Sequence, residues 1–420
     1  MKRILWIVNT IFPYPSSQMG YKTNVFGGWM NSLHNEMIKN GDIKLAIATV
    51  YKGKTLKRFF DGKTIYYLVP SKNNMKYEKK LEKYWQEVYN DFKPVIVHLH
   101  GTEFAHGLSF LRCFPNVKSV VSIQGIVTLC AKHYLDGIKK TDIIKNITLR
   151  DIIRHDNLFE QQKKYYKRGL NEVKILKRAD IIIGRTSFDY NFVKENTDFS
   201  KYRKCNESLR DIFYNSIWDN KNIEKYSIFI PQASYPIKGL HRLIEQLAAV
   251  KSKFSDMKVY IAGANIIANS TLIERIKLSG YGKYLKSLIK KYNLFDNIIF
   301  VGLLNEEEIM GMLKKCSLFV QASTLENSSN SLGEAMIIGM PILASDVGGT
   351  KDIFSNKKDG FLFNYNNSSQ ISKIIIDIFS GKIDTCKMQS NARKHALNTH
   401  NIEDNKKTML DIYDEIMEDL

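Results

Sequence analysis

The chain has 420 residues, 44% of them hydrophobic and 25% charged, which fits an ordinary globular protein but exceeds the usual length of one domain. No stretch approaches the uninterrupted apolar length of a membrane span. The five cysteines are scattered and form no C-x-x-C pair, which argues against a zinc site and for a reducing compartment. We therefore expect a cytoplasmic protein of at least two domains.

Charge is distributed unevenly along the chain, whose formal net charge is +19. Residues 1–225 hold 39 Lys and Arg against 22 Asp and Glu, a net +17, whereas the remainder holds 23 against 21. A basic half beside a neutral half suggests an anionic partner for the first half, such as a membrane surface, a lipid-linked phosphate or nucleic acid. A lysine-rich genome composition would give the same excess, and the sequence leaves both explanations open.

The first elements are predicted to be a strand, a loop and a helix. The apolar run at residues 4–8 is too short for a signal peptide and is expected to be a buried strand. A loop through Pro13 ends at Gly27 and Gly28, and helical spacing follows over residues 29–39. Glycines at a helix N-terminus let backbone amides approach a phosphate or another ligand, although a plain turn has the same composition.

Further apolar runs alternate with helical patterns in the first half of the chain. Runs that read as strands lie at residues 43–50, 65–69, 95–99 and 117–123, and a helical pattern lies at 78–91. This alternation predicts a parallel, doubly wound α/β sheet, in which ligands sit at the carboxyl ends of the strands. Gln124 and Arg185 each follow a predicted strand, and Arg185 could offer a fixed cation to a phosphate.

A polar stretch near residues 215–226 marks the start of a second series of strands and helices. We predict an N-terminal Rossmann-like domain over residues 1–220, a second one over 221–400, and a final helix over 401–420 that crosses back to the first domain.

Glycines follow several predicted strands of the second series. Lys238 and Gly239 precede a helical pattern, and Gly263 and the pair Gly302-Leu303 stand just after strands. Glycine at such places allows close approach of a ligand to the backbone, but tight packing of the turn would also require it.

The most informative stretch covers residues 318–354, where a strand, a polar loop with Glu326, a helix with Glu334 and a second strand follow one another. Asn330 or Ser331 is expected to cap this helix, which would put Glu334 in its first turn and Glu326 just before it. Amides at a helix N-terminus attract phosphate. A carboxylate in the first turn can accept hydrogen bonds from a ribose diol, and one before the helix can reach a sugar beyond the diphosphate. The spacing suits a nucleotide-sugar, although either glutamate alone could be an ordinary surface residue.

The pattern Glu-x7-Glu, followed by Ala-Met-x-x-Gly-x-Pro-Ile-x-Ala-x-x-x-Gly-Gly, resembles the signature of family-4 retaining glycosyltransferases of the GT-B fold, of the bacterial polysaccharide type. This resemblance implies that Glu334 binds the ribose and that Glu326 lies beside the donor sugar. It also implies that the backbone of Asn330, Ser331 and Leu332 faces the diphosphate.

The same resemblance assigns Lys238 to the donor diphosphate and makes it, with Glu326, a catalytic residue. Gly263, Gly302 and Leu303 would belong to the donor site, and Gly27 and Gly28 to an acceptor or phosphate loop.

Two positions depart from the family pattern. Gln124 stands where the family often has a histidine that contacts the sugar, and an amide cannot act as a general base. The arginine that usually precedes the lysine is replaced near Gln232, and Arg185 is a candidate substitute.

We therefore expect two doubly wound domains that face across a cleft, the GT-B fold. The expected reaction moves a sugar, with retention of configuration, from a nucleotide-sugar donor to a glycan or lipid-linked acceptor in surface polysaccharide synthesis. No Asp-x-Asp motif is present, so neither a metal nor a cofactor is expected, and Lys238 with helix-terminal amides would stabilise the leaving group. No nucleic-acid partner is expected, whereas the basic half suggests attachment at the inner face of the plasma membrane. The alternatives are a nucleotide-sugar epimerase or hydrolase on this fold, and a non-catalytic sugar-nucleotide-binding subunit.

Overall fold

The computed structural model describes residues 1–21, 27–367 and 369–418. Part of the loop predicted before Gly27 (22–26) and the last two residues of the predicted C-terminal helix (419–420) lie outside the described residues. The chain forms two compact units. Unit 1 comprises Met1–Leu129, Tyr165–Arg210 and His400–Leu420, and unit 2 comprises Cys130–Lys164 and Asp211–Thr399.

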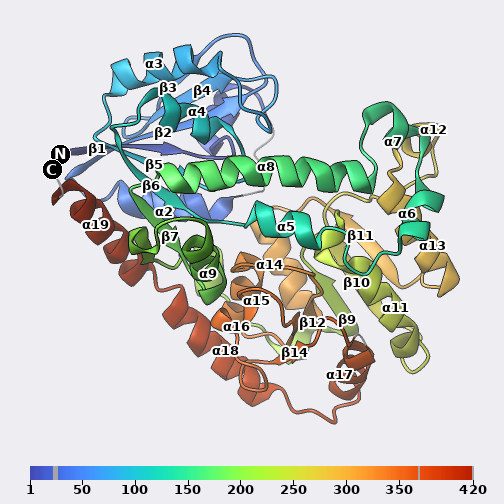
Figure 1. The fold of residues 1–420 in the computed structure, drawn as a ribbon. Helices are drawn as coiled ribbons and strands as arrows, with labels where there is room; N and C mark the ends of the chain where they lie inside the picture. The colour runs from blue at the N-terminus through green and yellow to red at the C-terminus, as the bar shows by residue number, and fades with distance from the viewer. Residues whose placement is uncertain (22–26, 368, 419–420) are drawn as a thin grey trace. The chain divides into compact units, whose positions relative to one another are not determined.

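Unit 1 contains a sheet of eight strands among its described residues, in the order β3-β4-β2-β1-β5-β6-β7-β8 (Figure 1). The strands are β1 (Lys2–Ile7), β2 (Ile43–Tyr51), β3 (Lys57–Phe60), β4 (Ile65–Pro70), β5 (Ile96–His100), β6 (Lys118–Ser122), β7 (Ile181–Gly184) and β8 (Tyr202–Lys204). All neighbours pair in parallel except β3, which runs antiparallel to β4 at the edge. The predicted parallel sheet is confirmed, and its carboxyl ends lie at one edge.

Helices cover both faces of this sheet, because the residues of its central strands are apolar on both sides. The helices with residues in unit 1 are α1 (Pro13–Gln18), α2 (Gly28–Met37), α3 (Leu81–Phe92), α4 (His106–Cys113), α5 (Val127–His133), α8 (Leu158–Arg178), α9 (Ser187–Asn196) and α19 (Ile402–Glu418). Leu5 packs in a core with α3, α4, α8 and α9, whereas Trp6 packs in the opposite core with α2 and α19. Pro13 starts a short helix rather than a loop, because proline is favoured in the first turn.

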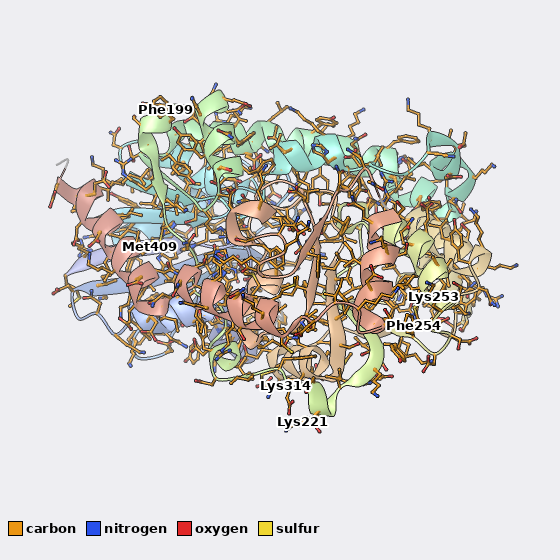
Figure 2. The ribbon with its side chains drawn as sticks, turned by 90° about the horizontal axis from the view of Figure 1, so that it is seen from below. Phe199, Lys221, Lys253, Phe254, Lys314 and Met409 are labelled. Atoms are coloured by element: carbon orange, nitrogen blue, oxygen red, sulfur yellow. The ribbon has the colours of Figure 1, made fainter. Side chains whose placement is uncertain are left out.

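The C-terminal helix α19 is part of unit 1. Met409, labelled on this helix in Figure 2, is buried in the core below the sheet. The Trp6 indole donates to the Tyr413 hydroxyl at 3.0 Å, and that hydroxyl lies 2.6 Å from Nδ1 of His98. These contacts satisfy polar atoms that the core would otherwise leave without partners.

Unit 2 holds a second sheet, in the order β11-β10-β9-β12-β13-β14, with every neighbouring pair parallel. Its strands are β9 (Glu224–Ile230), β10 (Lys258–Ala262), β11 (Ile298–Gly302), β12 (Cys316–Gln321), β13 (Ile342–Ser345) and β14 (Phe361–Phe363). Its helices are α6 (Lys140–Asn146), α7 (Leu149–Arg154), α10 (Asp211–Tyr214), α11 (Leu240–Lys251), α12 (Leu272–Lys277), α13 (Gly280–Lys291), α14 (Glu306–Lys315), α15 (Asn330–Ile338), α16 (Thr350–Ile353), α17 (Ser369–Phe379) and α18 (Cys386–Thr399). α11 packs with α13 and α17, and α15 packs with α18.

Residues 130–164 lie in unit 2, whereas the sequence placed them in the first of two contiguous domains. Buried polar contacts hold this segment there. Asp151, which is 1% exposed, accepts a hydrogen bond of 2.8 Å from the amide of Gly280 at the start of α13. The segment therefore joins the unit that carries the Glu326–Glu334 stretch.

Candidate active site

The stretch between β12 and β13 begins with a capped helix. The Leu332 amide donates to Oγ of Ser329 at 3.3 Å, and the Gly333 amide donates to the Ser329 carbonyl at 3.1 Å. Ser329 is therefore the N-cap, and the expectation of Asn330 or Ser331 is wrong by one or two residues. Because α15 starts at Asn330, Glu334 lies in its second turn rather than its first, with only 4% of its surface exposed. At the other end, Gly339 adopts a left-handed φ of 77° and closes the helix.

Glu326, in the loop before this helix, forms an ion pair with Lys238 of the turn Pro236–Lys238. Nζ of Lys238 lies 2.6 Å from Oε1 of Glu326, and the Ser323 hydroxyl donates to the same oxygen at 2.6 Å. Burial disfavours the charged ammonium, but the Glu326 carboxylate and the Tyr235 ring outweigh it, so the pKa of Lys238 lies above its usual value. Lys238 is therefore a fixed cation at neutral pH.

Backbone packing explains why these two residues meet. A Cβ atom on Gly239 would sit 1.8 Å from the carbonyl oxygen of Ala322, so only glycine fits beside the end of β12. Gly239 also has a φ of 69°, which favours glycine. Two residues after Ala322, the Thr324 amide donates to the carbonyl of Ile237 at 2.7 Å. These contacts bring the turn Pro236–Lys238 against the loop that holds Glu326.

The backbone of Glu326 is also held by the loop that follows β13. Its carbonyl accepts a hydrogen bond of 3.0 Å from the amide of Gly349, the second glycine of the Gly-Gly pair in the sequence pattern. The two glutamates of the pattern are thus held by different elements, Glu326 by loops and Glu334 by α15.

The glycines predicted at strand ends pair with each other. The Gly263 amide donates to the Gly302 carbonyl at 2.7 Å, and both residues have positive φ, 108° and 86°. Leu303 follows with 58% of its surface exposed. This hydrogen bond connects the loops after β10 and β11, and the Leu303 side chain beside it is exposed to solvent. Their assignment to a donor site stays a prediction.

The remaining predicted residues lie in unit 1, where the structure brings two of them together. The Gln124 amide donates to Oε1 of Glu207 at 2.5 Å, and Nη1 of Arg185 donates to Oε2 of the same carboxylate at 2.6 Å. Arg185 is 4% exposed, so its charge is balanced within unit 1 by a buried carboxylate. Its use as the cation that replaces the missing arginine stays a prediction.

Gly27 and Gly28 begin α2 as expected of a helix N-terminus. Gly27 has a φ of 80°, and a Cβ on Gly28 would meet the Arg210 side chain at 2.7 Å. Close packing in unit 1 therefore explains the second glycine, and the assignment of both glycines to an acceptor or phosphate loop stays a prediction.

Sequence reasoning missed two groups of residues. Glu207 hydrogen-bonds both Gln124 and Arg185, but the pattern at residues 205–210 assigned it no role. His133 and Asp136 pair at 2.7 Å in unit 2, and the His133 carbonyl accepts from the Thr324 hydroxyl at 3.3 Å, next to the loop of Glu326. The sequence shows their spacing of three residues, but it does not show that they pack in the same unit as Glu326.

Among the described residues, no group of three His, Cys, Asp or Glu side chains is arranged to hold a metal ion. No helix in the described part of the chain is long and apolar enough to cross a membrane.

Comparison with known proteins shows which family part of the chain resembles and which fold the whole chain shares. Residues 215–395 match the family Glycosyl transferases group 1. Over the whole chain, the fold is similar to that of sucrose-phosphate synthase from Thermosynechococcus elongatus, with a TM-score of 0.76, 13% identity and full coverage of both chains. Residues 215–395 are thus similar to the group 1 glycosyltransferases, and the chain has the GT-B fold.

Two curated relatives are similar over part of their length. The putative glycosyltransferase YtcC of Bacillus subtilis is 25% identical over 57% of this chain and 61% of its own. The UDP-Gal:alpha-D-GlcNAc-diphosphoundecaprenol alpha-1,3-galactosyltransferase of Escherichia coli is 26% identical over 38% of this chain and 41% of its own. The chain thus spans less than two thirds of the length of either relative.

Proposed function

We propose that this protein transfers a sugar from a nucleotide-sugar to a glycan or lipid-linked acceptor in surface polysaccharide synthesis, with retention of configuration. The observation that carries the proposal is the Lys238–Glu326 ion pair beside the start of α15. A raised-pKa ammonium and helix N-terminal amides offer positive charge to a departing nucleoside diphosphate. Glu326 then faces the donor sugar, and Glu334 accepts from the ribose.

Two further observations support the acceptor class. The E. coli relative is named for transfer to a lipid-linked diphosphate, and residues 1–225 of this chain carry a net +17. An acceptor with anionic phosphates in a membrane surface is attracted to such a basic region. We propose peripheral attachment of the protein at that surface.

The test starts with a panel of sugar nucleotides, including UDP-glucose, UDP-galactose, UDP-N-acetylglucosamine and GDP-mannose, screened by thermal shift. The tightest binder is then incubated with and without lipid-linked and glycan acceptors, and products are identified by mass spectrometry and NMR. A transferase forms a glycoside of unchanged anomeric configuration only with acceptor present.

Other product patterns identify the competing functions. Conversion of the donor alone to a second sugar nucleotide indicates an epimerase, and release of free sugar indicates a hydrolase. Tight binding of the donor without turnover under any condition indicates a binding subunit. Absence of binding to every member of the panel would refute the proposal.

A further inference from the structure

The end of α5 lies in unit 2, beside the loop that holds the ion pair. The His133 carbonyl accepts from the Thr324 hydroxyl at 3.3 Å, and the Thr324 amide donates to the carbonyl of Ile237, the residue before Lys238. One threonine therefore links the last residue of α5 to the turn that carries the fixed cation.

Two residues of α5 lie near the turn that carries Lys238. Cys130 and His133 are three residues apart and share a helix face. The Cys130 thiol is close enough to Lys238 to add to the causes that raise the pKa of Lys238. The His133 carbonyl contacts Thr324 in the loop of Glu326, so the end of α5 lies beside that loop.

The His133 ring is held by a carboxylate and remains accessible. Nδ1 lies 2.7 Å from Oδ2 of Asp136, and the two side chains are 43% and 39% exposed. The Asp136 carbonyl accepts from Nε2 of His241 at 2.9 Å and from the Tyr365 hydroxyl at 3.3 Å, so the loop itself is fixed. No described residue hydrogen-bonds Nε2 of His133, so this nitrogen is available to a ligand.

A bound diphosphate would carry more negative charge than Lys238 alone can neutralise. The diphosphate of a sugar nucleotide carries about two negative charges, whereas Lys238 brings one positive charge, which it shares with Glu326. We propose that His133, as an imidazolium positioned by Asp136, donates a hydrogen bond from Nε2 to the donor diphosphate. This inference rests on the proposed function and names a binding residue that sequence reasoning did not identify.

Several other groups could influence the His133 charge. The charged or titratable residues around its helix, its partner loop and the facing loop are Cys130, Lys132, Asp136, Lys238, His241, Arg242, Glu326 and Tyr365. Burial lowers the pKa of His241 to about 4, so it stays neutral across the range of the test.

The test measures sugar-nucleotide affinity by calorimetry between about pH 6 and about pH 8.5, using the tightest binder of the panel. A sugar nucleotide is used because its diphosphate is esterified at both ends and does not titrate there. An imidazolium binds a diphosphate more tightly than a neutral imidazole does, so the wild-type affinity should fall as the pH rises across this range. The expected loss is roughly tenfold, the worth of one charge-assisted hydrogen bond.

His133→Gln keeps an exposed polar side chain and should remove this pH dependence, with an affinity near the wild-type value at high pH. Asp136→Asn should shift the dependence to lower pH. His155→Asn is the matched control, because His155 also faces a carboxylate in unit 2, at 3.5 Å from Glu160, and is 86% exposed. His155→Asn should retain the wild-type dependence of sugar-nucleotide affinity on pH.

A second measurement does not depend on any substitution. Bound sugar nucleotide should protect Cys130 from maleimide labelling, read by peptide mass spectrometry, but should leave the exposed Cys386 reactive. Full labelling of Cys130 at saturating ligand would overturn the placement of α5 beside the donor. If Lys238→Ala weakens binding but His133→Gln keeps the pH dependence, this inference fails while the proposed function stands. If no sugar nucleotide binds the wild type, both fail.

Discussion

Replacing Lys238 with alanine tests the centre of the site. The substitution removes the ammonium that lies 2.6 Å from Oε1 of Glu326 and leaves that carboxylate with the Ser323 hydroxyl. Lys238 pairs with the Glu326 carboxylate in the folded protein and is proposed to bind the donor diphosphate. Its loss should therefore affect both stability and binding.

The effect on stability is smaller than for a fully buried pair. The Lys238 and Glu326 side chains are 19% and 13% exposed, so water screens part of their attraction. Loss of one partner of a fully buried pair costs about 3–5 kcal/mol, and we expect about 1–2 kcal/mol here. The double variant Lys238→Ala/Glu326→Gln should recover part of this loss, because it removes the uncompensated carboxylate.

The effect on binding is specific to phosphate. Loss of a charge-assisted hydrogen bond weakens nucleoside diphosphate binding by about 1.5–3 kcal/mol, which is roughly a tenfold to hundredfold loss of affinity. The nucleoside alone does not reach Lys238, so its affinity should change by less than about twofold.

Calorimetric titrations with nucleoside and nucleoside diphosphate measure this difference, and urea unfolding measures stability. Lys253→Ala is the control, because Lys253 is an exposed lysine of unit 2 at the surface shown in Figure 2. An equal loss of affinity for both ligands in Lys238→Ala would mean that the lysine only supports the fold, and the assignment to the diphosphate would be wrong.

The remaining predictions concern the glutamates, metal ions, membranes and pH. Glu334→Gln should lower the affinity for free nucleoside diphosphate, whereas Glu326→Gln should spare it and lower turnover; titrations and initial rates that show equal losses would contradict the two roles. Activity should survive EDTA, and a loss that Mg²⁺ or Mn²⁺ reverses would show a metal requirement. Co-sedimentation with anionic liposomes should weaken as salt rises, because surface charge is screened over about 10 Å at 0.1 M, and salt-independent binding would exclude the electrostatic mechanism. Burial lowers the pKa of His100 to about 3 and of His106 to about 4. Their neutral forms therefore stabilise the fold above the unfolded pKa of about 6.5, and urea unfolding should show stability falling as the pH drops towards about 4.

The sheets were predictable from the sequence because buried parallel strands are continuous apolar runs. The strands at residues 4–8, 43–50 and 342–344 needed only this local signal. The edge strands β3 and β8 were missed, because Lys57–Phe60 and Tyr202–Lys204 are short and contain no fully buried residue, and their pairing depends on a neighbouring strand.

The details of the site depended on contacts that a sequence pattern does not fix. Ser328, Ser329, Asn330 and Ser331 are all competent helix caps, and only the Ser329 hydroxyl meets the Leu332 amide. That choice moves Glu334 into the second turn. In the same way, the sequence pattern assigned no role to Cys130 or His133, because no local signal shows that residues 130–164 pack in unit 2.

Under the proposed function, the Lys238–Glu326 ion pair affects how a donor binds. Lys238 cannot give its full charge to a diphosphate while Oε1 of Glu326 accepts from it at 2.6 Å. Either the ammonium turns from the carboxylate to the phosphate, or the carboxylate turns to a sugar hydroxyl and leaves the ammonium behind. A sugar nucleotide supplies both groups, whereas a free nucleoside diphosphate supplies only the phosphate and leaves Glu326 without a hydroxyl to bind. Since a carboxylate that loses its partner in a partly buried site costs free energy, the pair favours ligands that bring sugar and diphosphate together. Under the proposed function, the ion pair therefore gives the site a way to prefer the intact donor over the product of transfer.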